Sequence, residues 1–213
     1  MAARDKGELP AALKLVLASS NPGKRREYLE LAGERGVEIV LLPNFSELPA
    51  FDESFSTFAE NAAGKALHYS RFTNETVLAD DSGLIVPVLG GAPGVHSARY
   101  AGPKANDQDR YNKLLREMNG REGQNRRARF VCVTTVARQG RVLIVTSDSA
   151  EGLLLKEPRG AGGFGYDPIF LLSEPGCTFA EATGEQKNRL SHRGKAFRKS
   201  LALLADPRSF EMV

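Results

Sequence analysis

The chain has 213 residues, of which 41% are hydrophobic and 26% are charged, as in ordinary soluble globular proteins. No run approaches the roughly 20 apolar residues that a membrane-spanning helix needs, which excludes that class. The excess of 29 basic over 26 acidic residues, a net charge of +3, is too small to indicate nucleic-acid binding, although it is compatible with a phosphorylated ligand. We therefore expect one globular domain.

The chain begins with a polar segment, 1–12, which we interpret as an N-terminal extension of a domain at 13–204, with a tail at 205–213. The extension lacks the apolar core of an export signal. Cys132 and Cys177 are the only cysteines, and two lone cysteines without an export signal indicate reduced thiols in a cytoplasmic protein. Cys132 lies in an apolar run, which favours buried packing over reactivity.

Strands and helices alternate in the first half of the chain. Apolar spacing and capping residues predict, in order, a strand at 13–18, a helix from Ser20 to about Glu34 that Gly36 stops, a strand at 37–42, a loop at 43–54, a helix at 57–71, a short strand at 76–79, an extended segment at 84–89, a loop at 90–102 and a helix at 107–118.

The second half is richer in strands. After a polar break at 120–124, two strand-like runs at 127–138 and 141–147 meet at Gln139 and Gly140, which predicts a hairpin. The remaining elements are expected as an extension of this sheet at 151–156, a glycine-rich loop at 158–167, a strand at 169–172 and a final helix at 192–204. Together these elements predict an α/β fold with a mixed, twisted central sheet flanked by helices.

The first candidate site lies between the first strand and the first helix. It consists of Ser19, Ser20, Asn21, Pro22, Gly23 and Lys24. A helix N-terminus offers free backbone N–H groups and a partial positive charge, which suit a phosphate group, and Lys24 would add a full charge. The segment is not a Walker A loop, because its first glycine is missing and Arg25 follows the lysine. On its own it could also be only a well-capped helix start.

The second candidate site is the acidic segment Asp80, Asp81, Ser82 and Gly83, which follows a short apolar strand. Adjacent carboxylates at a strand end can hold a hard cation such as Mg²⁺ and orient a water molecule. Because side chains alternate along a strand, both acids could serve one ion only if the backbone turned there, and Gly83 would permit that turn. Upstream, Asp52 and Glu53 could supply another ligand. A solvated turn is the alternative.

The third and fourth candidate sites lie near the end of the chain. In the loop at 162–168, Phe164 or Tyr166 could stack on a base and Asp167 could accept a hydrogen bond from its edge, or the aromatic rings could simply cap the core. Further on, Lys187 precedes Ser191, His192 and Arg193, where Ser191 can cap the last helix and the other side chains can act as donors. An ordinary helix start with a surface arginine is the alternative.

Six sequence blocks in this order resemble the inosine/xanthosine triphosphate pyrophosphatases, also called the Ham1 family of non-canonical purine NTP pyrophosphatases. The blocks are Ser-Ser-Asn-Pro-Gly-Lys at 19–24, Thr-Phe-Ala-Glu-Asn-Ala at 57–62 with Lys65, Ala-Asp-Asp-Ser-Gly-Leu at 79–84, Gly-Gly-Ala-Pro-Gly-Val-His-Ser-Ala-Arg-Tyr at 90–100, Gly-Gly-Phe-Gly-Tyr-Asp-Pro at 162–168 and Ser-His-Arg at 191–193. The resemblance extends from Leu13 to about Leu204. The departures are mild, since Ser19 stands where many members have threonine.

The resemblance implies a Mg²⁺-dependent hydrolase with its active site in a cleft between two lobes. It would convert ITP, dITP and XTP to the monophosphate and pyrophosphate and so cleanse the nucleotide pool. The segment 19–24 would hold the triphosphate, Asp81 would activate the attacking water, and Glu53 and Asp81 would bind the metal. The other nucleotide contacts would come from Ser82, Phe164, Gly165, Tyr166, Asp167, Lys187, His192 and Arg193. The family usually forms homodimers, which we adopt as an expectation.

Two other interpretations stay open from the sequence. Maf-like nucleotide pyrophosphatases act on pyrimidine or modified nucleotides and share a similar strand–loop–helix start, but the blocks at 162–167 and 191–193 argue against them. A small basic RNA-binding or nucleotide-sensing module would bind without turnover, yet no stripe of interleaved basic and aromatic residues supports it. We therefore expect a small nucleotide as substrate, and neither a nucleic acid nor a membrane as partner.

Overall fold

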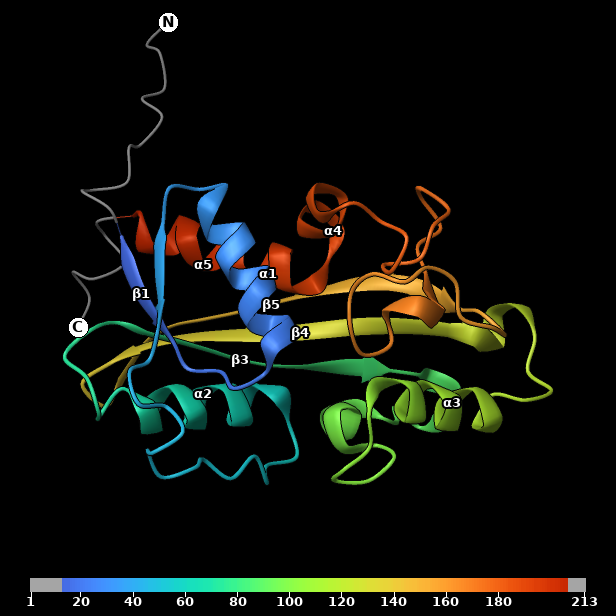
Figure 1. Cartoon of the computed structure of the whole chain (residues 1–213), viewed down its shortest axis with the longest axis horizontal. Coiled ribbons are helices and arrows are strands. Elements are labelled where there is room, and N and C mark those ends of the chain that lie inside the picture. The colour runs from blue at the N-terminus through green and yellow to red at the C-terminus, as the bar shows by residue number, and fades with distance from the viewer. Residues whose placement is uncertain (1–12, 207–213) are drawn as a thin grey trace, which may run out of the picture.

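A computed structural model describes residues 13–206 and contains one six-stranded sheet with helices on both faces (Figure 1). The strands are β1 (Lys14–Leu17), β2 (Glu38–Leu41), β3 (Val77–Ile85), β4 (Arg127–Arg138), β5 (Arg141–Leu154) and β6 (Phe170–Leu171). Their order across the sheet is β2-β1-β3-β4-β5-β6. The first three strands run parallel and the last three add in antiparallel fashion, which confirms the predicted mixed sheet.

The helices divide between the two faces of the sheet. They are α1 (Pro22–Gly33), α4 (Gly184–Leu190) and α5 (His192–Leu204) on one face, and α2 (Phe58–Tyr69) and α3 (Asp107–Glu117) on the other (Figure 1). Separate apolar clusters lie under these layers: Tyr28 and Phe197 belong to one, Ala66 and Tyr69 to another, and Leu114 and Phe170 to a third. No helix within residues 13–206 combines the length and apolar character needed to cross a membrane.

The two predicted helix caps that border the candidate sites are confirmed. The side chain of Asn21 accepts a hydrogen bond from the backbone N–H of Lys24 at 3.0 Å, and Pro22 occupies the first helical turn. Ser191 likewise accepts from the backbone N–H of Gly194 at 3.1 Å. Both caps bond to a residue three positions ahead, which is why local sequence was sufficient to predict them.

The backbone does not make the turn that Gly83 would permit, because β3 continues through the whole acidic segment. It pairs with β4 without interruption from Val77 to Ile85. Glycine is required at position 83 because the 3-10 helix η2 (Gly94–Arg99) packs closely against the strand. A Cβ atom at Gly83 would lie only 2.4 Å from the carbonyl oxygen of Gly94. Consequently Asp80 and Asp81 point to opposite faces of the sheet and cannot serve one ion together.

Several boundaries also differ from the expectation. The runs at 141–147 and 151–156 belong to one strand, β5, which ends at Leu154. The polar residues between the two runs also pair with β4, so the strand is not interrupted there. The segment 84–89 ends in the 3-10 helix η1 (Pro87–Leu89), and the strand at 169–172 shrinks to β6 after η4 (Asp167–Ile169). The short helix α4 was missed, although its Thr183 and Gln186 form a capping box. The predicted extension at 1–12 and most of the tail lie outside the described residues.

Cys132 is buried in β4, as predicted, beside the side chain of Asp80. Burial raises the pKa of its thiol to about 12. The thiol therefore stays protonated and acts as a packing group, since the thiolate is the reactive form.

Candidate active site

Two adjoining hollows lie where α1 begins beside β3. One, here called the slot, is bordered by Glu27, Ser82, Phe130, Phe164, Asp167, His192 and Arg193, among others. The other, the basin, is bordered by Ser19, Ser20, Glu53, Lys65 and Asp81, with an apolar wall from Phe45 and Phe51. Asn21, Lys24 and Ser82 border both, and the basin has a volume of about 590 Å³. The segments predicted as separate sites therefore meet in one cleft.

The start of α1 forms the boundary between the two hollows. Asn21 and Lys24 face both of them, while Ser19 and Ser20 face the basin. Pro22 and Gly23 do not border either hollow. Gly23 instead lies against the ring of Phe164, since a Cβ atom there would be 2.5 Å from the ring. The predicted phosphate segment thus has four facing residues and one glycine that lets an aromatic ring approach the helix backbone.

Asp80, one of the two candidate cation ligands in the acidic segment, instead lies at the centre of a buried ion cluster. Its Oδ2 is 3.1 Å from Nζ of Lys24 and 3.3 Å from Nη2 of Arg193, and its side chain is 0% exposed. Burial alone would raise the pKa of Asp80, but the charges of Lys24 and Arg193 outweigh it and hold the pKa well below the usual carboxyl range. Asp80 therefore stays ionised and fixes both cations.

The ion cluster extends from Arg193 towards the glycine-rich loop. The guanidinium of Arg193 donates to Glu27 and, at 2.8 Å, to Oγ of Ser82. Oε1 of Glu27 also forms an ion pair with Nζ of Lys187 at 2.6 Å, and Lys187 pairs with Asp167 as well. Charges of alternating sign thus join α1, β3, α4, α5 and the loop. Paired charges of this kind can stay buried because each has a partner of opposite sign.

The loop at 162–167 closes one side of the slot. Oδ2 of Asp167 accepts a hydrogen bond from the backbone N–H of Phe164 at 2.8 Å. The Phe164 ring lies 5.0 Å from Nζ of Lys187 and 5.7 Å from the guanidinium carbon of Arg193. Tyr166 is mostly buried in the core, and its hydroxyl donates to the carbonyl of Ser97 at 2.9 Å. Phe164 is therefore the ring available to a planar ligand, and Tyr166 anchors the loop.

His192 also borders the slot. Its ring stacks on Phe130 with a centroid distance of 4.7 Å and an interplanar angle of 8°. Burial, reinforced by the charge of Arg193, lowers the pKa of His192 well below its usual value, so the ring is neutral near pH 7. Its Nδ1 has no hydrogen-bond partner among the described residues. The slot is therefore bordered at this position by an uncharged ring.

Asp81 faces the basin, on the other side of β3. Its Oδ2 accepts from Nδ2 of Asn61 at 3.0 Å, and its Oδ1 accepts from the backbone N–H of Ser82 at 2.8 Å. Burial raises the pKa of Asp81, although the charge of Lys24 opposes the effect, and the nearby carboxylate of Glu53 raises the pKa further. A carboxylate with only neutral hydrogen-bond donors can still attract a cation or a water proton.

Lys65 borders the basin and Asn61 supports Asp81 from behind it, and neither was among the predicted site residues. They lie four positions apart in α2 and therefore share one helix face. Lys65 pairs with Glu53. Burial alone would lower the pKa of Lys65, but the carboxylates of Asp80, Glu53 and Asp81 raise it, so the amine remains charged. The sequence signal for both residues is the block at 57–62 with Lys65.

The predicted metal ligands Glu53 and Asp81 border the same basin. Carboxylate oxygens are the donors that Mg²⁺ prefers, and this ion often keeps several waters and binds through one or two carboxylates plus substrate phosphates. Within residues 13–206, no group of three or more His, Cys, Asp or Glu side chains is arranged to hold a metal. The chemistry of two carboxylates beside a phosphate-type helix start fits Mg²⁺, although Glu53 would have to share its charge between Lys65 and the ion. Asp80 is unsuitable because its charge is already matched on the other face.

Comparisons with known proteins identify the family of this chain and agree with its fold. The model of the Ham1 family matches residues 15–203. A dITP/XTP pyrophosphatase of Geobacillus kaustophilus is 50% identical over 186 residues, which cover 87% of this chain and 91% of that protein. A dITP/XTP pyrophosphatase of Desulforamulus reducens is 45% identical over 192 residues, with coverages of 90% and 96%. The solved structure of a HAM1 protein from Coxiella burnetii has a TM-score of 0.79 at 39% identity, covering 90% of this chain and 98% of that one.

Proposed function

Because this chain belongs to the Ham1 family, we propose that it is a hydrolase of non-canonical purine nucleoside triphosphates, with ITP, dITP and XTP as substrates and the monophosphate and pyrophosphate as products. The observation that carries the proposal is the position of Asn21 and Lys24 between the slot and the basin. A nucleotide whose base enters the slot would extend its phosphates past Lys24 to Asp81. The segment 13–204 would be the catalytic unit.

The phosphates would be bound mainly by the start of α1. Its free N–H groups and the side chains of Ser19, Ser20 and Asn21 offer donors, and Lys24 and Lys65 offer charge. A triphosphate gains negative charge on its leaving group during hydrolysis, so cations placed in advance lower the barrier. We propose that attack occurs between the α and β phosphates and that pyrophosphate leaves towards Lys24.

Asp81 would take the proton of the attacking water. Asn61 and the N–H of Ser82 orient its carboxylate, and its raised pKa brings it closer to the range in which a general base is effective. Glu53 and Asp81 would hold Mg²⁺, which supplies charge stabilisation to the phosphates and lowers the pKa of bound water. Chelation by EDTA should therefore abolish turnover, and added Mg²⁺ should restore it.

The base would be selected in the slot. Hypoxanthine and xanthine carry a carbonyl at position 6, where adenine carries an amino group. Lys187, His192 and Arg193 would favour the carbonyl, because a buried donor left unpaired by adenine costs roughly 1–3 kcal/mol. The ring of Phe164 would stack on the base from one side. Gly165 and Asp167, which also border the slot, would contact the edge of the base.

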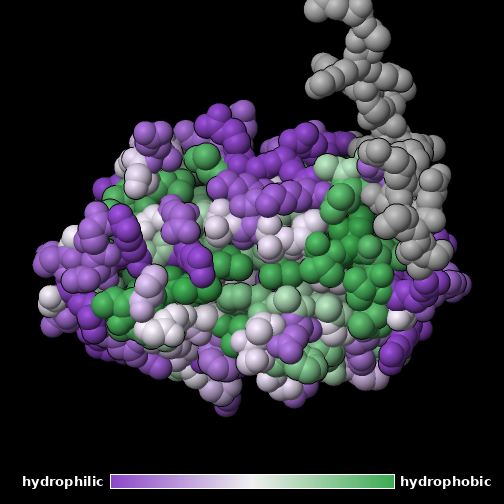
Figure 2. All heavy atoms as spheres, turned by 180° about the vertical axis from the view of Figure 1, so that it is seen from behind, coloured by the Kyte–Doolittle hydropathy of each residue, from purple (hydrophilic) through white to green (hydrophobic). Residues whose placement is uncertain are grey.

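We also propose that the protein forms a homodimer and resides in the cytoplasm. Figure 2 shows apolar residues gathered on the side of the molecule opposite the view of Figure 1. Among the exposed apolar side chains, Val142 and Val145 of β5 are 39% and 48% exposed. An exposed apolar surface of this kind favours burial against a second copy. Light scattering on the wild type and on Val145→Glu should give a dimer mass for the first and a reduced mass for the second.

The experiment that tests the proposed activity is pyrophosphate release with Mg²⁺ from ITP, dITP, XTP, ATP, GTP, CTP and UTP. We expect strong release from the first three and little from the other four. Release mainly from pyrimidine nucleotides would instead favour the Maf-like alternative. No release from any nucleotide would rule out the enzymatic proposal and favour a binding module.

A further inference from the structure

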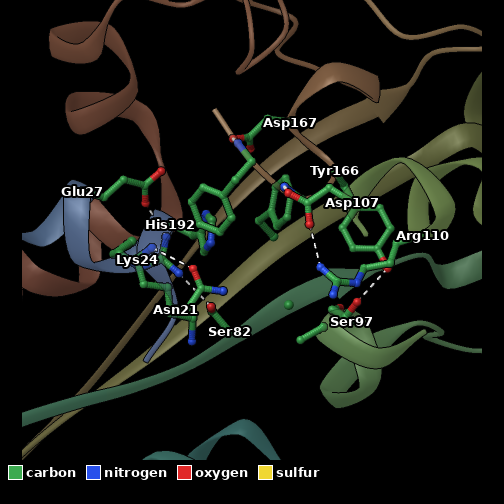
Figure 3. Close-up of a pocket in the computed structure, with 16 residues that line it drawn as sticks. Asn21, Lys24, Glu27, Ser82, Ser97, Asp107, Arg110, Tyr166, Asp167 and His192 are labelled. Carbon is green, nitrogen blue, oxygen red and sulfur yellow. Dashed lines mark hydrogen bonds and ion pairs between the residues drawn. The ribbon is translucent and has the colours of Figure 1, made fainter. Parts of the chain in front are cut away.

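The glycine-rich loop at 162–167 is held from both sides of the slot. On one side Lys187 contacts Asp167. On the other side the loop is tied to η2 and α3, where Tyr166 and Gly165 make one bond each. Figure 3 shows this second anchor, with Asp107, Arg110, Tyr166 and Ser97 together at one end of the pocket and Lys24 and Glu27 at the other. The far anchor has no part in the proposed chemistry.

Asp107, in the first turn of α3, connects the helix to the loop. Its Oδ2 accepts a hydrogen bond from the backbone N–H of Gly165 at 2.7 Å, and its Oδ1 accepts from Nη1 of Arg110 at 2.6 Å. Arg110 is itself fixed, since its Nη2 donates to the carbonyl of Ala105 at 2.6 Å. Both oxygens of Asp107 are therefore used, and the arginine holds the carboxylate in the orientation that serves Gly165.

The bond to Gly165 acts at a sensitive point of the loop. Gly165 has a φ of 63° and lies between the slot ring Phe164 and the anchor Tyr166. The nearby carboxylate of Asp167 already serves the N–H of Phe164, so it does not replace Asp107 as the acceptor for Gly165. The slot measures about 70 Å³, against 590 Å³ for the basin, so the position of Phe164 decides what enters it.

We propose that Asp107 is a positioning residue of this site: through Gly165 it sets the distance of Phe164 from the start of α1, and Arg110 orients it. The inference rests on the proposed function only in taking the slot as the place where the base binds. It predicts an effect on substrate affinity rather than on the chemical step, because Asp81 and Lys65 lie in the basin, away from α3.

The first test compares two aspartates in the same helical turn. Asp107→Ala should raise KM for ITP about tenfold, as expected for the loss of a hydrogen bond to a charged group, and should change kcat by less than about threefold. Asp109→Ala is the matched control, because Asp109 accepts from the backbone N–H of Asn106 at 3.0 Å and completes the helix cap without contacting the loop. It should leave KM unchanged. Asp107→Asn keeps one acceptor oxygen but loses the pairing with Arg110, so its KM should lie between those of the wild type and Asp107→Ala.

The second test needs no activity. Hydrogen–deuterium exchange in peptides that cover 162–167 should be faster in Asp107→Ala than in the wild type, and unchanged in Asp109→Ala. An unchanged exchange rate in Asp107→Ala would overturn the inference, as would an equal rise in KM for Asp109→Ala. A wild type that releases no pyrophosphate would refute the proposed function, and the exchange rates would still decide the role of Asp107.

Discussion

The two faces of β3 treat neighbouring carboxylates in opposite ways. Asp80 points to the face of α1 and α5, where Lys24 and Arg193 surround it and its pKa falls well below the usual range. Asp81 points to the face of α2, where its direct donors are the amide of Asn61 and a backbone N–H, and its pKa rises. Both side chains are buried, so burial alone does not separate them.

The difference is one of partners. Permanent cations satisfy Asp80 before any ligand arrives, so its carboxylate is a structural charge that orients Lys24 and Arg193. The direct hydrogen-bond donors of Asp81 are neutral, so a metal ion or the proton of a water molecule would stabilise its buried negative charge. Residues adjacent in sequence can therefore divide positioning and catalysis between them, provided that the strand does not turn.

The largest expected effect is the loss of kcat on substitution of Asp81, on the α2 face of β3. Asp81→Asn should lower kcat for ITP by about 10³-fold, because the amide can neither accept the proton of water nor offer a charge to Mg²⁺. The midpoint of thermal unfolding should fall only slightly, since the amide keeps one acceptor oxygen and loses just one of the two bonds from Asn61 and Ser82. Steady-state kinetics and a melting curve on the same preparation would measure both quantities.

The control for this variant is Asp52→Asn, because Asp52 is an exposed acid next to Glu53. Its kcat should stay close to that of the wild type. Near-normal turnover in Asp81→Asn would remove Asp81 from the role of base. An equal loss in both variants would instead indicate a general effect of negative charge around the basin.

On the face of α1 and α5, a substitution at Asp80 should lower the free energy of unfolding. Asp80→Asn leaves the guanidinium of Arg193 and the amine of Lys24 without one counter-charge, and breaking a buried ion pair on one side typically costs about 3–5 kcal/mol. We expect the free energy of unfolding in urea to fall by about 3 kcal/mol, far more than for Asp81→Asn. Equal stability of the two variants would contradict the assignment of separate roles.

The dependence of stability on pH provides a second measurement on Asp80→Asn. The folded-state pKa values of Asp80 and Glu27 lie below those of the unfolded chain, so their contribution to stability is complete above the ordinary carboxyl range. It is lost as the pH falls from that range, about 4, towards the lower folded-state values. Urea titrations from pH 6 to pH 3 should show a shallower decline for Asp80→Asn than for the wild type.

Local patterns in the sequence predicted the parts of the site that depend on neighbours along the chain. The caps at Asn21 and Ser191 are bonds across three residues, and the candidate segments around them do meet in one cleft. The strand at 76–79 was predicted too short because its continuation depends on pairing with β4, more than 40 residues away in the register Asp81↔Val133.

Contacts between distant segments escaped the sequence analysis for the same reason. Arg193 and Asp80 are 113 positions apart, and Gly165 and Asp107 are 58 apart. Arg193 was predicted as a ligand contact, yet its side chain is 1% exposed and most of its donors bind Asp80, Glu27 and Ser82. A motif indicates that a charged residue belongs to a site, whereas only the fold shows which charge it offsets.

The smallest expected effect is a pH-dependent loss of stability caused by His192. It tests whether the α1 and α5 face of the sheet accepts a charge that has no partner of opposite sign. His192 lies on that side, and its folded-state pKa is well below the usual 6.5, so the unfolded chain takes up a proton first as the pH falls. The free energy of unfolding should therefore decrease below pH 6.5 by up to about 1.4 kcal/mol per pH unit. His192→Gln should remove this slope between pH 7.5 and pH 5.5, whereas His68→Gln, on the outer part of α2, should retain it. If both variants keep the slope of the wild type, the ring of His192 accepts a proton in the folded state, and the α1 and α5 face is more permissive towards an added charge than the pairing of Asp80 suggests.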